Sequence, residues 1–325
     1  MEHLLNIEDL CVTYRNKERK VYAVRNASIE LNIGDSLGIV GESGSGKSTL
    51  AMAAIRLLPQ GSAEVTGKSE FMGQDILTLD DASLRALRWK NFAVVFQKAM
   101  NSLSPVHRIS TQIEDIYRVH EPDADRQTIR ARALELFRMV GLPERAYHIY
   151  PHEMSGGMLQ RVSIAISLLH HPQLVIFDEA TTALDVVTQG QILQEVVRLE
   201  QGMSMARIMI THDMSVVAAS CSKVAVMYAG RMMETGPARE VLKNPMHPYS
   251  KGLLASFPSL RGERRALNAI SGFLPDMSVR HAGCLFASRC HKATVRCREA
   301  QPAMTELAEG HRVACWLYGG DADEQ

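Results

Sequence analysis

The sequence predicts an α/β protein built on a parallel sheet, because three short apolar runs each end in polar residues. Residues 37–40 lead into a glycine-rich loop, residues 174–177 end in two acids, and residues 208–210 end in Thr-His-Asp. Short apolar runs are typical of strands buried in a parallel sheet. Ligands of such sheets bind beyond the carboxyl ends of the strands. We therefore expect these polar residues to lie at one edge of the sheet.

The composition is that of an ordinary globular protein without a charge bias. The chain has 325 residues, and its 36 basic and 36 acidic residues give a formal net charge of +0. A general nucleic-acid binder would show a basic excess, so no nucleic-acid partner is expected. No apolar run approaches the roughly 20 residues of a membrane-spanning helix. The start, MEHLLNIEDL, lacks the basic region of a signal peptide, which predicts a cytoplasmic protein.

The segment GESGSGKS, residues 41–48, fits the phosphate-binding pattern GxxxxGK(S/T) between a strand and a helix. Its glycines let backbone N–H groups turn toward phosphate oxygens, and the helix N-terminus adds partial positive charge. Lys47 is expected to contact the β- and γ-phosphates and Ser48 to bind Mg²⁺. A flexible Gly/Ser linker is the alternative. The residues expected to bind ATP here are Gly41, Ser43, Gly44, Gly46, Lys47, Ser48 and Thr49.

Chemically active side chains follow the other two apolar runs. Asp178 is expected to hold Mg²⁺ through its water shell, and Glu179 to orient and polarise the attacking water. A solvated acidic turn is the alternative for this pair. His212 is placed to donate a hydrogen bond to the γ-phosphate, although a lone histidine is more often structural or solvent-facing. We predict Glu179 and His212 as catalytic residues.

A second site with exposed backbone donors is predicted in the segment YPHEMSGGMLQ. Ser155 is a good N-cap, and apolar residues follow it at helical spacing. Ser155, Gly156 and Gly157 would then expose backbone N–H groups at a helix N-terminus, although these three residues alone could also form a simple loop. A single phosphate loop does not explain a second anion site in the same chain.

Phosphate loop, signature segment, acidic strand end and histidine together resemble the ATP-binding cassette (ABC) ATPases over about residues 1–255. The resemblance implies a P-loop NTPase cassette with a RecA-like core, an antiparallel β subdomain and an α-helical subdomain at about residues 98–165. It also implies a head-to-tail dimer of cassettes. Ser155, Gly156 and Gly157 would then cap the γ-phosphate of the ATP that the partner cassette binds.

Further positions match the family's motifs one by one. Tyr14, in CVTYR, matches the aromatic residue that stacks on adenine, and Tyr22 is the weaker candidate. Gln97 matches a catalytic glutamine that senses Mg²⁺ and water, so the expected Mg²⁺ contacts are Ser48, Gln97 and Asp178. Asp185, in TTALD, matches the loop that crosses the dimer interface.

The sequence also departs from the family pattern in several places. Met158 replaces the glutamine that usually follows SGG, and Ala180 replaces the proline that usually follows the two acids. Lys98 and Ala99 replace an acid–proline pair. No catalytic group is removed, so the departures bear on the rate of turnover. Ala180 is expected to loosen the turn after Glu179, because proline would fix its φ angle.

The segments YPHEMSGGM, MNSLSP and NPMHPYSKGLLASFP resemble the ATPase subunits of oligopeptide, dipeptide and nickel importers. That resemblance implies a C-terminal extension, here about residues 256–325. It also implies a second ATPase subunit, often a different chain, with two transmembrane permeases and an external solute-binding protein. ATP hydrolysis would energise uptake of peptides or similar small solutes, with this chain peripheral to the cytoplasmic face of the inner membrane.

Four of the six cysteines, namely Cys284, Cys290, Cys297 and Cys315, lie in the extension. Their C-x5-C-x6-C-x17-C spacing is neither a common zinc pattern nor a ferredoxin pattern, so spacing alone leaves a metal site and free thiols equally open. A bound metal would stabilise an extension that has little hydrophobic core of its own. The importer resemblance implies a 4Fe–4S cluster, with zinc as the alternative. Leu285 and His291 replace the usual prolines. Cys11 and Cys221 are expected to be small buried hydrophobes.

The rival class is a cassette ATPase that acts in DNA repair or translation. Repair members carry long coiled-coil or zinc-hook insertions, and no long heptad run is present here. Translation members carry two cassettes in one chain, whereas this sequence has one phosphate loop. A redox protein with an incidental ATP site would leave most of the motifs unexplained. The transported solute is expected to be recognised by the partner chains.

Overall fold

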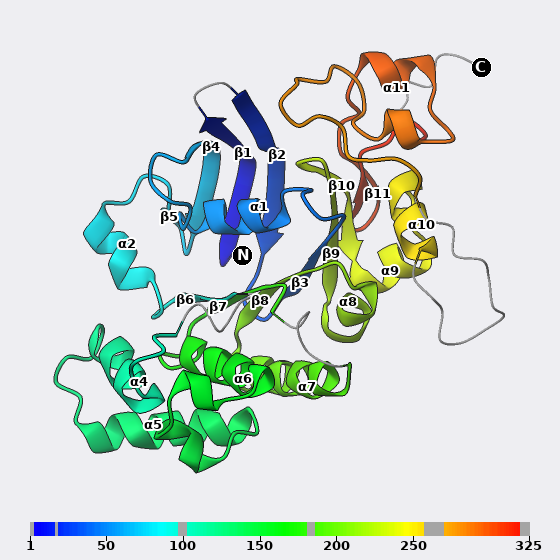
Figure 1. Cartoon of the computed structure of the whole chain (residues 1–325). Helices are drawn as coiled ribbons and strands as arrows, with labels where there is room; N and C mark the ends of the chain where they lie inside the picture. The colour runs from blue at the N-terminus through cyan, green and yellow to red at the C-terminus, as the bar shows by residue number, and fades with distance from the viewer. Residues whose placement is uncertain (1–2, 17–18, 97–102, 181–185, 257–269, 319–325) are drawn as a thin grey trace. The chain divides into compact units, whose positions relative to one another are not determined.

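The computed structural model describes residues 3–16, 19–96, 103–180, 186–256 and 270–318 (Figure 1). The chain forms two compact units, which we describe separately. The first contains Met1–Leu31, Leu37–Thr78 and Ile210–Gln325, and the second contains Asn32–Ser36 and Leu79–Met209. Gln97 and Asp185, two of the expected site residues, lie outside the described residues.

An antiparallel sheet in the first unit confirms the β subdomain expected for a cassette. Its strand order is β2-β1-β4-β5, and long antiparallel pairings join β1 to both β2 and β4. Alternate residues at the end of β2, among them Ala27, Ile29 and Leu31, are buried, as expected for a sheet with one covered face. The strands are β1 (Leu5–Asn16), β2 (Arg19–Leu31), β4 (Ala63–Phe71) and β5 (Gln74–Asp75).

The second sheet of this unit positions the phosphate loop. Strand β3 (Ser36–Val40) pairs in parallel with β9 (Lys223–Tyr228), which pairs antiparallel with β10 (Arg231–Pro237). The turn between β9 and β10 is built on Ala229 and Gly230, whose φ angles are 47° and 84°. These two residues therefore join β9 and β10 in a tight turn.

The C-terminal extension adds strands to the same sheet. Strand β12 (His311–Val313) pairs antiparallel with β10, and β11 (Thr305–Ala308) pairs with β12. Leu285 and Phe286, each 3% exposed, join a core cluster that contains Tyr228 and Tyr249. These two residues of the extension therefore pack into the core of the first unit, whereas others, such as Phe273 and Val295, are exposed.

The helices of the first unit flank these strands. They are α1 (Lys47–Ala54), α8 (Met214–Ser220), α9 (Ala238–Lys243), α10 (Pro248–Ala255), the 3₁₀ turn η3 (Ala287–Arg289) and α11 (Val295–Glu299). Helix α1 follows the phosphate loop directly. The Ser69 hydroxyl on β4 donates to the Ala54 carbonyl, 2.7 Å away, and so satisfies a backbone group at the end of α1.

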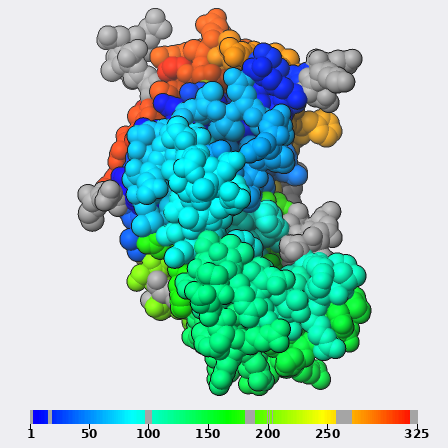
Figure 2. All heavy atoms as spheres, turned by 90° about the vertical axis from the view of Figure 1, so that its left-hand side faces the viewer, coloured from blue at the N-terminus to red at the C-terminus, as the bar shows by residue number. Residues whose placement is uncertain are grey.

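The second unit combines parallel strands with most of the long helices. Strands β6 (Phe92–Val95) and β7 (Leu174–Asp178) pair in parallel, and β8 (Ala206–Thr211) lies next to β7. Its helices are α2 (Asp81–Leu87), α4 (Ile109–Arg118), α5 (Arg126–Met139), η1 (Glu144–Tyr147), η2 (Pro151–Glu153), α6 (Gly156–Ser167) and α7 (Val186–Met203). Figure 2 shows the teal and green atoms of α4 and α5 gathered on one face of this unit.

The expected strands and helices are confirmed where the sequence pattern is strongest. The apolar runs at 37–40, 174–177 and 208–210 lie in β3, β7 and β8, and the helix after the phosphate loop is α1. The signature helix is α6, and the apolar residues expected on one face of it, Leu159, Val162, Ile166 and Leu169, are buried, although Leu169 lies beyond the last residue of the helix, Ser167. In the described part of the chain, no helix is both long enough and apolar enough to cross a membrane.

Candidate functional site

The phosphate loop has the conformation of an anion-binding turn that leads into a helix. Gly46 is the N-cap of α1 and has a φ angle of 97°. The Lys47 side chain turns back into the loop, where its ammonium donates to the carbonyl oxygens of Gly41 and Glu42, each 2.9 Å away. Lys47 is only 5% exposed, so its charge is fixed inside the loop. This geometry can hold a phosphate group between a cation and a helix N-terminus.

Several of the expected nucleotide contacts around the loop are at least partly exposed. Ser43, Gly44 and Ser48 are exposed, and Thr49 is half-buried. The hydroxyl groups of Tyr14 and Thr49 are 3.3 Å apart, which places the predicted adenine-stacking residue beside helix α1. These residues therefore share one region of the first unit.

Tyr22, the weaker candidate for adenine stacking, has other neighbours. The guanidinium groups of Arg25 and Arg280 lie 5.1 Å and 5.3 Å from the centroid of its ring. Its backbone N–H donates to the Met277 carbonyl of the extension. Because these two arginines engage the ring of Tyr22, Tyr14 remains the better candidate for stacking on adenine.

His212 lies in the first unit, directly after β8, and is exposed. The next residue, Asp213, caps helix α8 by accepting a hydrogen bond from the Ser215 N–H at 2.8 Å. The cap fixes the turn in which His212 stands. His212 therefore stands at a strand end, where the sequence places it, and its contact with the γ-phosphate stays a prediction.

The acidic pair belongs to the second unit. Asp178 is the last residue of β7, and Glu179 follows it with a φ angle of 47°. A positive φ is unfavourable for a residue with a side chain, and such strain is common at functional sites. Ala180, where the family usually has proline, is buried with 2% exposure. The looser turn expected from the missing proline stays a prediction.

The signature segment forms the expected helix N-terminus in the second unit. Ser155 is the N-cap of α6, and its hydroxyl accepts a hydrogen bond from the Met158 N–H at 3.3 Å. Ser155 and Gly156 are exposed, and Gly157 is half-buried. The backbone donors of this turn can therefore reach an anion that approaches from outside.

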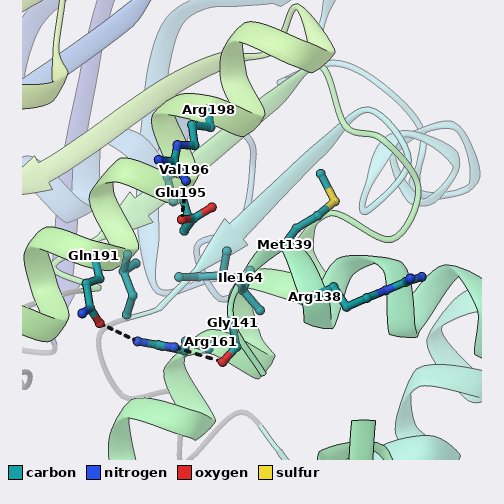
Figure 3. A pocket seen from close by; sticks show the side chains of 11 residues that line it. Arg138, Met139, Gly141, Arg161, Ile164, Gln191, Glu195, Val196 and Arg198 are labelled. Atoms are coloured by element: carbon teal, nitrogen blue, oxygen red, sulfur yellow. Dashed lines mark hydrogen bonds and ion pairs between the residues drawn. The ribbon is translucent and has the colours of Figure 1, made fainter. Parts of the chain in front are cut away.

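The second unit also contains a cavity of about 470 Å³ that the sequence did not predict (Figure 3). Arg161 points across it and donates to the Gly141 carbonyl and the Gln191 side chain, at 3.1 Å and 3.2 Å. Arg138, Glu195 and Arg198 also line it. None of the expected site residues contributes to this cavity, so it is separate from the predicted chemistry.

The four cysteines of the extension come together around one cavity of about 130 Å³. Burial raises the pKa of Cys284 to about 11, and the other three cysteines add to the rise, so all four lie close to one another. Burial also raises the pKa of Cys290 and of Cys315. Within the described residues, however, no group of three or more His, Cys, Asp or Glu side chains is arranged to hold a metal ion.

The structure brings two further residues to the phosphate loop that the sequence pattern did not indicate. Arg289, from the cysteine-containing extension, forms an ion pair with Glu42 of the loop at 2.9 Å. The Tyr249 hydroxyl accepts a hydrogen bond from the Glu42 N–H, also at 2.9 Å. These contacts join positions more than 200 residues apart, and no local signal in the sequence relates them.

Family models match most of the chain. The model described as ABC transporter matches residues 24–182, and the model of the oligopeptide/dipeptide transporter C-terminal region matches residues 233–297. The second match begins in β10 and includes three of the four clustered cysteines.

Curated relatives are similar over almost their full length. The chain is 42% identical to the probable peptide ABC transporter ATP-binding protein y4tR of Sinorhizobium fredii, over 96% of this chain and 94% of the relative. It is 42% identical to the oligopeptide transport ATP-binding protein OppD of Haemophilus influenzae, over 98% of both chains. It is 39% identical to the dipeptide transport ATP-binding protein DppD of Escherichia coli, also over 98% of both.

Among solved structures, the dimeric ATP-binding cassette MJ0796 bound to ADP and phosphate is similar, with a TM-score of 0.65. The identity is 27%, and the match covers 72% of this chain and 99% of that one. The chain belongs to the ABC transporter family of ATP-binding proteins. Within that family it has the C-terminal region of the oligopeptide/dipeptide transporters, which favours a transporter ATPase over the DNA-repair or translation class.

Proposed function

We propose that this chain is the ATP-hydrolysing subunit of an ABC importer for peptides or similar small solutes. The observation that carries the proposal is the near full-length similarity to peptide import ATP-binding proteins, together with the match to their C-terminal region. The partners would be a second ATPase subunit, two transmembrane permeases and an external solute-binding protein. The chain would act at the cytoplasmic face of the inner membrane.

Each expected site residue has a defined role in this proposal. Lys47 and the backbone of the phosphate loop would bind the ATP phosphates, and Tyr14 would stack on adenine. Ser48 and Asp178 would hold Mg²⁺, and Glu179 would take a proton from the attacking water as that water displaces ADP from the γ-phosphate. His212 would donate a hydrogen bond to the γ-phosphate.

The remaining expected residues would act at the dimer interface or beside the metal. The signature turn of one cassette, beginning at Ser155, would cap the γ-phosphate in the partner cassette. Gln97 would contact Mg²⁺ and the attacking water, and Asp185 would lie at the dimer interface. Both residues are outside the described part of the chain. ATP binding would close the pair of cassettes, and hydrolysis would reopen it and drive the permeases.

The domain boundaries are part of the same proposal. Residues 1–255 would form the cassette, residues 98–165 its helical subdomain, and residues 256–325 the transporter-type extension. The match to the C-terminal model supports an extension of this kind, although that match begins earlier, at residue 233. The helical subdomain would contact the permease.

We propose that the four extension cysteines hold a 4Fe–4S cluster. Their arrangement around a single cavity fits thiolate ligation of one group. The cluster would cross-link Cys284 and Cys290, which flank the turn that contacts the phosphate loop, to Cys297 and Cys315. Bound iron would be released when a ligand is removed.

Replacement of a cluster ligand tests this assignment. We expect Cys290→Ala, purified without oxygen, to lose most of its iron and acid-labile sulfide because a thiolate ligand is missing. The matched control is Cys221→Ala, because Cys221 is a half-buried cysteine outside the cavity. Unchanged iron and sulfide in Cys290→Ala would show that the cluster assignment is wrong. Stoichiometric zinc in the unchanged protein would favour the alternative metal.

The transport proposal is tested by purifying the tagged chain from native membranes in mild detergent. Two permeases and a second cassette should copurify, and cells that lack the chain should lose uptake of a labelled peptide. Restoration of uptake by the unchanged chain, but not by Lys47→Ala, would connect transport to ATP binding. Recovery of soluble partners alone, with normal peptide uptake in the deletion strain, would contradict the proposal and favour the rival class.

A further inference from the structure

The turn from Cys284 to Cys290 faces the cysteine cavity on one side and the phosphate loop on the other. Cys284 and Cys290 line the cavity. Between them, Phe286 precedes the 3₁₀ turn η3, and Arg289 ends it, with Cys290 as the C-cap residue. Backbone hydrogen bonds from Ala287 to Cys284 and from Arg289 to Phe286 make this turn compact. Arg289 and the two cysteines therefore belong to one compact turn.

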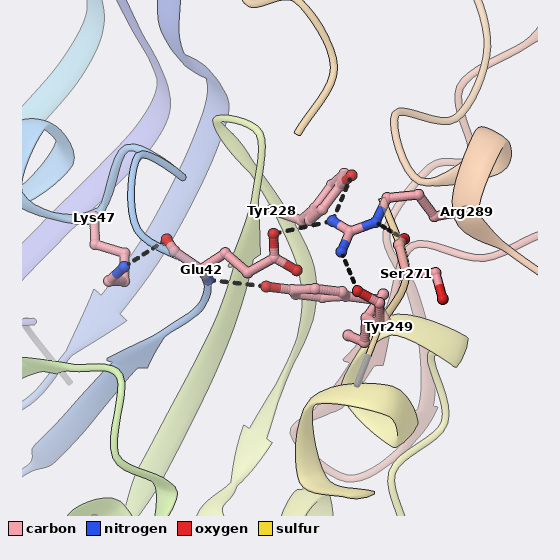
Figure 4. Close-up of polar contacts among 7 residues, drawn as sticks. Glu42, Lys47, Tyr228, Tyr249, Ser271 and Arg289 are labelled. Atoms are coloured by element: carbon pink, nitrogen blue, oxygen red, sulfur yellow. Dashed lines mark hydrogen bonds and ion pairs between the residues drawn. The ribbon is translucent and has the colours of Figure 1, made fainter. Parts of the chain in front are cut away.

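Arg289 is held in place by several acceptors (Figure 4). Its Nη1 lies 2.9 Å from the Glu42 carboxylate and 3.2 Å from the Tyr228 hydroxyl. Its Nε and Nη2 donate to the carbonyl oxygens of Ser271 and Ile270, at 2.7 Å and 2.9 Å. The Arg289 side chain is 6% exposed and that of Glu42 is 28% exposed. A guanidinium fixed by so many partners has one available position.

Aromatic packing connects the same turn to the backbone of the phosphate loop. The ring of Phe286 lies 5.3 Å from the rings of both Tyr228 and Tyr249. The hydroxyl of Tyr249 accepts the hydrogen bond from the Glu42 N–H at 2.9 Å. Burial raises the pKa of Tyr249, which keeps this hydroxyl neutral. The cysteine turn thus contacts both the side chain and, through Tyr249, the backbone of Glu42.

A third contact is made by the chain that precedes the cysteine turn. A Cβ built at Gly44 would be in ordinary contact, at 3.6 Å, with Cδ1 of Leu274. Leu274 belongs to the partly buried residues packed on the core cluster that contains Phe286. The extension therefore borders the phosphate loop at Glu42 and at Gly44.

We propose that Arg289 is a positioning residue through which the four-cysteine site sets the affinity of the phosphate loop for ATP. Glu42 places a negative charge in a loop that must bind a polyanion, and an unpaired carboxylate there would repel the phosphates. Arg289 neutralises that charge and fixes the carboxylate. An ordered cysteine site keeps Arg289 in this position. The inference depends on the proposed ATP site but not on the identity of the transported solute.

A charge-removing variant tests the positioning role. In the full-length chain with its ATPase partner, we expect Arg289→Gln to raise the Kd for MgATP roughly five- to tenfold, the effect of one nearby charge at a partly exposed site. The measurement is displacement of a fluorescent ATP analogue by MgATP. Turnover at saturating MgATP should change less than twofold, since Arg289 touches no reacting atom. The matched control, Arg298→Gln, removes an exposed arginine of the same extension and should leave the Kd unchanged.

Two further variants separate positioning from general stability. Arg289→Lys keeps the charge and should bind MgATP within about twofold of the unchanged chain. The double variant Glu42→Gln/Arg289→Gln removes the unpaired carboxylate and should recover most of the lost affinity. A double variant as weak as Arg289→Gln, or an Arg289→Gln chain with normal affinity, would overturn the positioning role.

The connection to the cysteine site has its own readout. As a single substitution, Cys290→Ala should raise the Kd for MgATP severalfold. Added to Arg289→Gln, it should raise the Kd less than twofold further, because both changes act through the contact between Arg289 and Glu42. Additive effects, or normal affinity in Cys290→Ala, would contradict the coupling. If the chain does not serve peptide import, the Kd values for MgATP should still follow this pattern, and only the uptake assay would give a negative result. The two proposals can therefore fail separately.

Discussion

Glu179→Gln should bind MgATP as tightly as the unchanged chain and lose most of its ATP turnover, about 10²- to 10⁴-fold. A glutamine has nearly the same shape as a glutamate but cannot accept the proton of the attacking water. Glu179 stands at the end of β7 with a φ angle of 47°, so its side chain is presented from a constrained turn. The measurement is phosphate release by the purified transporter at saturating MgATP, with the Kd determined in parallel.

Two companion variants make this result specific. Lys47→Ala should lose MgATP binding itself, because the loop's buried ammonium is removed. Glu144→Gln makes the same chemical change at an exposed glutamate of the second unit and should turn over normally. If Glu179→Gln hydrolysed ATP at the normal rate, the assignment of Glu179 as the general base would be wrong.

Local patterns were enough to predict the strands and loops that carry the candidate site. The phosphate loop, the end of β7 and the N-terminus of α6 each depend on residues adjacent in sequence, whose backbone preferences decide the local structure. The roles assigned to Gln97 and Asp185, by contrast, came from family resemblance and stay predictions. The adenine-stacking role of Tyr14 came from the same resemblance and also stays a prediction, although its hydroxyl lies close to Thr49 of helix α1.

The role of the extension was the part that local patterns could not predict. Strands β11 and β12 are short and partly polar, and they are stabilised by pairing with β10 across a long sequence separation. Phe286 is buried by Tyr228 and Tyr249, which no periodicity in residues 256–325 reveals. The pairing of Arg289 with Glu42 likewise depends on tertiary packing. Spacing alone left a metal site and free thiols equally open, and it gave no sign that a residue between the cysteines, Arg289, contacts the phosphate loop.

The second large effect is expected at Gly46, where alanine should abolish MgATP binding. Gly46 has a φ angle of 97°, and a Cβ there would overlap the backbone oxygen of Ala23 on β2. Left-handed strain alone costs about 1–2 kcal/mol. The overlap adds to this, because relieving it requires a shift of the loop or of the β2 backbone at Ala23. Together these effects should weaken binding by about 100-fold or more.

Gly61 provides a matched control for the strain at Gly46. It also has a positive φ angle, 73°, but nothing lies within 4 Å of a Cβ built on it. Gly61→Ala should therefore show the strain without the overlap, as a loss of about 1 kcal/mol in the free energy of unfolding with normal MgATP affinity. Thermal melting of both variants, alongside titration with MgATP, separates lost folding from lost binding. Normal affinity in a folded Gly46→Ala chain would mean that the loop can shift away from β2, and that its close packing on Ala23 is not required for holding phosphate.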